Sequence, residues 1–168
     1  SVIRIQDDSF MNCRSLSDIT IGNNVKYIGG EAFRECTGIT NIVIPDSVIY
    51  LGNAFIQCDN LTNVVIGSGV THLQTWTFYY CRNLTNITFS NSIKTISDDA
   101  FDECTSLADV YYNGTEDEWN GMLMGTGNDD LLNATIHFQP SPSVVLGDPT
   151  GDEKINSTDA LLCLQHSV

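Results

Sequence analysis

The chain contains 168 residues, of which 42% are apolar, and its 21 acidic and seven basic side chains give a formal net charge of −14. The charge is uneven: residues 1–97 carry seven acids and six bases, whereas residues 98–168 carry fourteen acids and one base. The acidic second half and the lack of a basic stripe argue against nucleic-acid binding. The sequence contains no run of 18 apolar residues, so we expect no membrane-spanning helix.

One sequence pattern of apolar residues, called the phrase below, occurs five times in the first 110 residues. Its clearest copy, from Val48 to Val64, reads V-x-x-L-x-x-A-F-x-x-C-x-x-L-x-x-V. A recurrence every 22 or 23 residues predicts a solenoid, in which each rung buries its apolar side against the next. Two of the recurring columns are phenylalanine and cysteine, at Phe10, Phe33, Phe55, Phe78 and Phe101 and at Cys13, Cys36, Cys58, Cys81 and Cys104.

The repeat predicts one parallel strand per unit, then a turn, a second short extended piece and a compact bend into the phenylalanine. Turn-forming residues lie where the turns are expected, for example at Pro45-Asp46-Ser47 and Gly67-Ser68-Gly69. The chain begins inside the phrase, with Val2 and Ile5 in the columns of later repeats, so we expect a fragment whose upstream repeats or cap are missing.

Six cysteines raise the question of disulfide bonds, and spacing alone leaves it open. Neighbouring rungs lie about 4.8 Å apart, which is within bridging distance. Five of the cysteines share one column, however, and their parallel side-chain directions would strain a bond. We therefore expect buried, unreactive thiols with raised pKa values.

The pattern changes after Val110, where we expect a cap covering about residues 110–138. Thr115 and Glu118 form a capping box that predicts a short helix running through Trp119 to Met122 and stopping near Gly125. Residues 134–138 alternate in polarity and predict a closing strand. A solenoid needs an atypical final element over its last rung, so Trp119 is interpreted as a plug over the core.

The repeat closely resembles the BspA-type leucine-rich repeat of bacterial surface proteins. Its marks are A-F-x-x-C-x-x-L-x-x-I at Ala32 to Ile42 and I-P-D-S-V at Ile44 to Val48, and the resemblance covers about residues 1–138. It implies a leucine-rich-repeat solenoid of the strand-rich α/β class with a short helical cap. It also implies a non-catalytic binding or adhesion scaffold, secreted or on the cell surface of a bacterium.

A linker rich in proline and serine is expected at residues 139–146, followed by a loop that could bind calcium. Calcium prefers six to eight oxygen ligands, and an EF-hand loop supplies them at positions 1, 3, 5, 7, 9 and 12. The residues at these positions are Asp148, Thr150, Asp152, Lys154, Asn156 and Asp159. Lys154, at position 7, would contribute its backbone carbonyl, and the others would contribute side-chain oxygens. An acidic tail that only looks like such a loop is the alternative.

Residues 147–168 resemble the first half of a type I dockerin, a small EF-hand-like loop-helix that docks onto the cohesin domain of a scaffoldin. The resemblance implies one Ca²⁺ site and a partner-binding helix face at Ser157, Thr158, Leu161, Leu164 and Gln165. Three features depart from the pattern: Thr150 replaces an Asn or Asp, Glu153 replaces a turn glycine, and the second calcium repeat is absent. A half module of this kind could also associate with a second copy of itself.

No catalytic constellation is apparent, because the histidines are scattered and neither H-E-x-x-H nor a paired C-x-x-C occurs. We expect His72 and His137 to be exposed strand positions and the chain not to be an enzyme. Residues 76–80 depart from the polarity of the other repeats. Their aromatic side chains could stack on a sugar, anchor a protein or simply cover a neighbouring repeat; they are Trp76, Tyr79 and Tyr80.

Three functions fit these features. The first is a secreted recognition module carried into a cellulosome-like assembly by calcium-dependent binding of the dockerin-like segment to cohesin. The second is a surface adhesin that binds a host protein or glycan through the solenoid. The third is an accessory module of a larger polysaccharide-degrading enzyme whose active site lies outside this chain.

Overall fold

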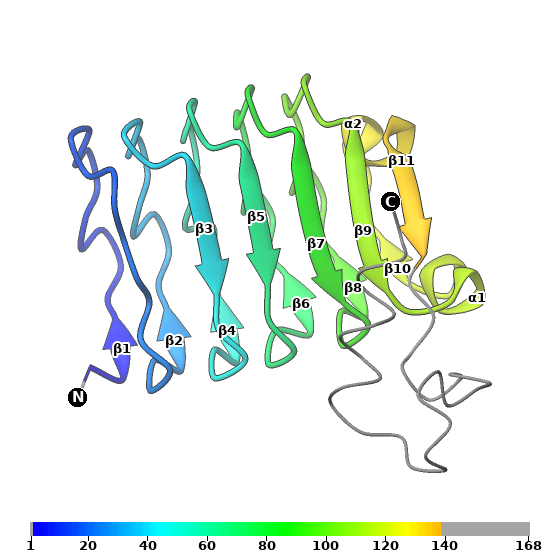
Figure 1. The fold of residues 1–168 in the computed structure, drawn as a ribbon, viewed down its shortest axis with the longest axis horizontal. Coiled ribbons are helices and arrows are strands. Elements are labelled where there is room, and N and C mark those ends of the chain that lie inside the picture. The colour runs from blue at the N-terminus through cyan, green and yellow to red at the C-terminus, as the bar shows by residue number, and fades with distance from the viewer. Residues whose placement is uncertain (1, 139–168) are drawn as a thin grey trace, which may run out of the picture.

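The computed structural model describes residues 2–138, which form a parallel β-solenoid (Figure 1). Five longer strands lie side by side in one sheet, in the order β11-β9-β7-β5-β3. Their bounds are β3 Asn41–Ile44, β5 Asn63–Ile66, β7 Asn86–Ser90, β9 Asp109–Asn113 and β11 Thr135–Phe138.

Short two-residue strands lie on the opposite side of the coil and form two three-stranded sheets, β1-β2-β4 and β10-β8-β6. Their bounds are β1 Arg4–Ile5, β2 Tyr27–Ile28, β4 Tyr50–Leu51, β6 His72–Leu73, β8 Thr95–Ile96 and β10 Leu123–Met124. From the second repeat on, each unit thus contributes one short and one long extended piece, as the sequence predicts, whereas the first repeat contributes only the short strand β1.

The strand register confirms the repeat spacing. Ile42 pairs with Val64, Val64 with Ile87 and Ile87 with Val110, at steps of 22 or 23 residues. All pairs are parallel, and the buried residues alternate with exposed ones along β3 and β5 because successive side chains of a strand point to opposite faces.

Helix is confined to the C-terminal end, so the α/β class that the sequence led us to expect is wrong in this respect. Among the described residues the helices are α1 (Glu116–Asn120) and α2 (Asp129–Asn133), each of five residues. Within the repeats, the segment after each short strand is a series of turns, whose tight left-handed bends leave no room for a helical turn.

The phenylalanine column forms a continuous stack through the core. Successive ring centroids lie 5.2, 5.3, 5.6 and 5.3 Å apart from Phe10 to Phe101, with the planes nearly parallel. Phe33, Phe55 and Phe78 are fully buried, whereas Phe10 is 38% exposed because it belongs to the first rung. The stack confirms that aligned apolar columns build the core.

The buried thiols link successive rungs. Cys58 donates a hydrogen bond to the carbonyl of Phe33 at 3.1 Å, and Cys36, Cys81 and Cys104 bond the phenylalanine of the preceding repeat in the same way. The five cysteines of residues 2–138 form no disulfide, and burial raises the pKa of Cys58 to about 12. Cys13 is exposed, so the prediction of burial is wrong for the first member of the column.

The capping box of α1 is confirmed. Thr115 accepts a hydrogen bond from the backbone N–H of Glu118, and the Glu118 carboxylate accepts one from the backbone of Thr115. The helix ends at Asn120, which is earlier than predicted. Trp119 is 9% exposed and its ring centroid lies 5.3 Å from that of Tyr112, which confirms its interpretation as a plug over the core.

Asn128 completes the last rung, a role that the sequence analysis did not predict. In earlier repeats the phenylalanine N–H donates to a backbone carbonyl of the next repeat, as Phe78 does to Ala100. Phe101 donates instead to the side-chain carbonyl of Asn128, at 3.0 Å. The Asn128 amide nitrogen donates to the carbonyls of Ser97 and Gly125, so one buried side chain replaces the missing backbone of a further turn.

Candidate ligand-recognition surface

A compact left-handed bend recurs in every repeat and aligns equivalent side chains across rungs. Its first and last residues have φ between 54° and 64°, for example at Glu31, Glu35, Trp76 and Tyr80; in the third repeat, which is one residue shorter, only the last residue, Gln57, has positive φ. A non-glycine residue at positive φ is uncommon, and here the neighbouring rungs hold it through backbone hydrogen bonds. The backbone N–H of Tyr80, for example, donates to the backbone carbonyl of Asp102 at 3.0 Å. We call residues 31–35, 53–57, 76–80 and 99–103 the bend face.

Three outward positions of each bend stack in columns, and their chemistry differs from rung to rung. They are Glu31, Arg34 and Glu35 in the second repeat, Asn53, Ile56 and Gln57 in the third, Trp76, Tyr79 and Tyr80 in the fourth, and Asp99, Asp102 and Glu103 in the fifth. Ile56 is the exception among them, because its side chain is buried. The fourth repeat is therefore an aromatic rung, with polar rungs on one side and an acidic rung on the other.

The structure brings the three predicted aromatic residues together at the surface. The ring centroids of Trp76 and Tyr79 lie 6.2 Å apart, and those of Tyr79 and Tyr80 lie 4.5 Å apart. The guanidinium of Arg82 lies 4.5 Å from the centre of the Tyr80 ring. Trp76 is 46% exposed, so it does not serve mainly to cover a neighbouring repeat.

A recess of about 320 Å³ lies beside the aromatic rung, near the lower end of the roughly 300–1,000 Å³ typical of small-ligand pockets. It spans three rungs, and its lining residues are Glu31, Arg34, Ile56, Gln57, Trp76 and Tyr79. The recess thus combines ring faces with a carboxylate, a guanidinium and an amide.

Arg34 is the polar centre of the recess. One of its terminal nitrogens donates to the Glu31 carboxylate at 2.7 Å, and this hydrogen bond raises the pKa of Arg34 against the opposing effect of burial. Its Nε is buried and has no hydrogen-bond partner among the described residues. Arg34 is therefore held in place while one donor remains unused.

The outer face of the five-stranded sheet carries a row of amides. Asn63 donates to the side-chain oxygen of Asn41 at 2.8 Å, and Asn86 donates to that of Asn63 at 2.9 Å. At the end of the row, Nε2 of His137 lies 2.7 Å from a carboxylate oxygen of Asp109. His72 is exposed on β6, as predicted, whereas His137 is partly covered and paired. These contacts organise the sheet surface, and a recess of about 380 Å³ lies at the β3 end of the row, where Asn41 and Val43 are among its lining residues.

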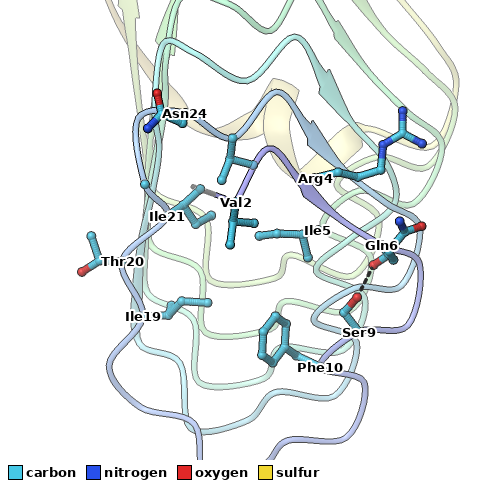
Figure 2. Close-up of a pocket in the computed structure, with 12 residues that line it drawn as sticks. Val2, Arg4, Ile5, Gln6, Ser9, Phe10, Ile19, Thr20, Ile21 and Asn24 are labelled. Atoms are coloured by element: carbon cyan, nitrogen blue, oxygen red, sulfur yellow. Dashed lines mark hydrogen bonds between the residues drawn. The ribbon is translucent and has the colours of Figure 1, made fainter.

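A larger cavity of about 540 Å³ lies at the N-terminal end of the coil, around Phe10 (Figure 2). Val2, Ile5, Ile19 and Ile21 line it with apolar side chains, and their columns continue into the core. Arg4, Gln6 and Asn24 are among its polar lining residues, but most of the cavity surface is apolar because it exposes the core columns at the first described rung.

The predicted calcium ligands, the predicted partner-binding helix face and the linker all lie outside the described residues. Within residues 2–138, no group of three or more histidine, cysteine or acidic side chains is arranged to hold a metal ion. In the same part of the chain, no helix has the length and apolar character needed to cross a membrane.

The fold and surface define a class of protein: a non-catalytic repeat scaffold. The chain belongs to the family described as "BspA type Leucine rich repeat region (6 copies)", whose model matches residues 3–120. Six copies agree with a solenoid of about six turns, one more than the five complete phrases in the sequence. This family consists of repeat scaffolds that are typically non-catalytic, and membership confirms the prediction that the chain is not an enzyme.

Solved structures of bacterial leucine-rich-repeat proteins share the fold. A leucine rich cell surface protein from Faecalibacterium prausnitzii A2-165 is 28% identical with a TM-score of 0.70, over 73% of this chain and 32% of that one. The chain thus spans about a third of the length of that relative. No curated protein matches the chain.

Two more distant structures support the fold alone. The leucine rich repeat protein of T. pallidum is 18% identical with a TM-score of 0.64, covering 83% of this chain and 81% of that one. A leucine-rich repeat protein from Bacteroides ovatus ATCC 8483 is 20% identical with a TM-score of 0.51, over 81% and 51% respectively.

Proposed function

We propose that this chain is a bacterial cell-surface recognition scaffold that binds its ligand on the bend face, at the aromatic rung and the adjoining recess. The observation that carries the proposal is the exposed Trp76 ring beside Arg34 and Gln57, where three rungs meet. The surface location is supported by the similarity to the F. prausnitzii cell surface protein.

The chemistry of the recess suits recognition without reaction. Trp76 and Tyr79 present ring faces and edges that can stack on a sugar ring or on the side chains of a protein. Glu31 offers acceptor oxygens, Arg34 offers donors, and Gln57 offers both, so a bound ligand can be oriented as well as held. The two ligand classes consistent with this surface are a glycan and a segment of a host protein.

Binding assays on matched variants test the proposal. We expect Trp76→Ala and Tyr79→Ala to abolish or strongly weaken binding to whichever hit emerges from a glycan array and a panel of host surface proteins. Tyr50→Ala is the control, because Tyr50 is also an exposed aromatic residue, 38% accessible, on a short strand of another repeat. Equal binding by Trp76→Ala and the unaltered chain to every hit would refute the proposal.

A second proposal concerns the C-terminal segment and is supported by the sequence pattern alone. The oxygen-bearing residues from Asp148 to Asp159 have EF-hand spacing, and the segment resembles the first half of a dockerin. In this proposal one Ca²⁺ binds to these residues, and the segment carries the solenoid to a cohesin domain.

Calorimetry on the full chain tests this second proposal. We expect Ca²⁺ to bind with one-site stoichiometry and Asp152→Ala to remove the binding. Titration against a panel of cohesins, with and without a chelator, then tests the docking step. Absence of a calcium signal in the full chain would exclude the calcium site, and a negative cohesin panel would exclude the docking role.

A further inference from the structure

The acidic rung next to the aromatic rung points to the class of partner. The backbone N–H of Tyr80 donates to the backbone carbonyl of Asp102 in the next rung, and this register places the aromatic and acidic residues in the same columns one rung apart. From this juxtaposition we infer that the bend face binds an arginine- or lysine-bearing segment of another protein, with basic side chains against both the rings and the carboxylates. This inference rests on the proposed function and specifies its ligand.

The carboxylates of this region have no basic partner within residues 2–138. In the second repeat, Arg34 pairs with Glu31 and Arg14 with Glu35, so that rung is largely neutralised. In the bend of the fifth repeat and in α2, by contrast, none of the acidic side chains forms an ion pair in the described part of the chain; the nearest paired carboxylate of that repeat is Asp109, which contacts His137 on β11. The acidic residues of this bend and of α2 are Asp99, Asp102, Glu103, Asp129 and Asp130.

The charge imbalance extends through the whole C-terminal end of the solenoid. Residues 98–138 contain ten acidic side chains, no lysine or arginine, and one histidine, His137. The pKa of Asp130 is raised by burial and by the neighbouring carboxylates of Asp102, Glu103 and Asp129. Their mutual repulsion is unrelieved within the described chain, and basic groups from a partner would relieve it. The potential of such a surface also speeds the approach of a basic partner.

The aromatic rung adds a second mode of binding for the same cations. A guanidinium over an aromatic ring is attracted by the negative ring face, most strongly over tryptophan. The chain already shows this contact once, because Arg82 lies over Tyr80. Trp76 has no such cation among the described residues and is 46% exposed, so its ring remains accessible to a partner. A neutral glycan could stack on Trp76 but would leave the carboxylate charge uncompensated.

Fluorescence anisotropy with two matched peptides tests the inference on the full chain. The probe is a labelled peptide of four arginines alternating with glycines, and the control peptide replaces each arginine by uncharged citrulline. We expect the arginine peptide alone to bind, with an affinity that falls steeply as salt is raised from 20 to 200 mM, roughly a threefold change in Debye length.

Variants separate the acidic rung from the aromatic rung. Neutralising the acidic rung with Asp99→Asn, Asp102→Asn and Glu103→Gln should weaken peptide binding about tenfold, since each exposed pair contributes a factor of roughly two to five. Trp76→Ala should weaken it about two- to fivefold, the range for an exposed cation over a ring. A control variant that neutralises three exposed carboxylates outside residues 98–138 carries Asp8→Asn, Asp18→Asn and Asp46→Asn.

The outcomes distinguish the inference from the proposed function. Failure of the arginine peptide to bind, equal binding of the citrulline peptide, or an equal loss in the control variant would overturn the inference. If instead a neutral glycan binds in a Trp76-dependent, salt-independent manner, the inference fails and the proposed function stands. Loss of repulsion should leave the acidic-rung variant at least as heat-stable as the unaltered chain, and circular dichroism during heating would show this.

Discussion

Truncating Phe78 to alanine should be among the most destabilising single changes in the chain. Its ring is fully buried, and its centroid lies 5.6 Å from that of Phe55 and 5.3 Å from that of Phe101. Phe→Ala in a packed core costs about 3–5 kcal/mol of unfolding free energy, because apolar contact is lost and a cavity remains. The same change at Phe10 should cost about 1–2 kcal/mol, since that ring is 38% exposed and the burial term scales with area.

Urea unfolding followed by circular dichroism measures both free energies. The Phe78→Ala midpoint should fall well below that of Phe10→Ala, with similar dependence on urea concentration in the two variants. Phe78→Leu, which keeps an apolar side chain of intermediate size, should fall between Phe78→Ala and the unaltered chain. The reasoning would be refuted if Phe78→Ala cost no more than Phe10→Ala, because the stacked column would then not be the main source of stability.

Three further predictions concern the cap and the thiols. Asn128→Ala should lower the free energy of unfolding by about 3 kcal/mol, because buried backbone groups lose their hydrogen-bond partners. Asn120→Ala, at an exposed position, should lower it little in the same urea assay. Equal losses in the two variants would contradict the role of Asn128. Thr115→Ala should cost about 1 kcal/mol through loss of the capping box, measured as a lower melting temperature. Burial raises the pKa of Cys58 from 9.0 to about 12, so the folded chain retains a proton that the unfolded chain releases. Its contribution to stability should therefore be complete below pH 9 and fall between pH 9 and 12; an unchanged pH slope of the urea midpoint in Cys58→Ala would contradict this.

The repeat architecture could be predicted from the sequence because each column depends on local spacing that recurs. A shift of one residue would turn Val64 and Ile66 to the solvent face, so the pattern of alternating apolar residues determines the register of β5. The same reasoning predicted the capping box of α1, since Thr115 and Glu118 are close in the sequence.

The cap beyond α1 could not be predicted in the same way. The roles of β10, α2 and Asn128 depend on contacts with residues some 27 to 31 positions earlier, such as the Phe101 N–H and the Ser97 carbonyl. A single asparagine before two aspartates carries no periodic signal. From the sequence alone Asn128 is predicted to be a loop residue, and its role becomes clear only from its contacts with the neighbouring rung.

The candidate site was visible in the sequence only as a departure from the repeat. Aromatic residues at 76–80 stood out, but whether Trp76 points outward depends on its left-handed backbone, with φ of 64°. The recess also needs Glu31 and Arg34, which are distant in sequence and meet Trp76 because the rungs stack. Their alignment follows from the register, so the recess could have been found by writing the repeats beneath one another.

The amide row on the five-stranded sheet has a consequence for how such chains can change length. Asn63 receives a hydrogen bond from the following rung and gives one to the preceding rung, so its two sides are chemically complementary. Duplicating the 23 residues from Asn63 to the position before Asn86 would create new junctions identical to the old ones. Growth by whole units is thus compatible with the sheet, while the final unit, where Asn128 contacts one specific rung, must stay at the end.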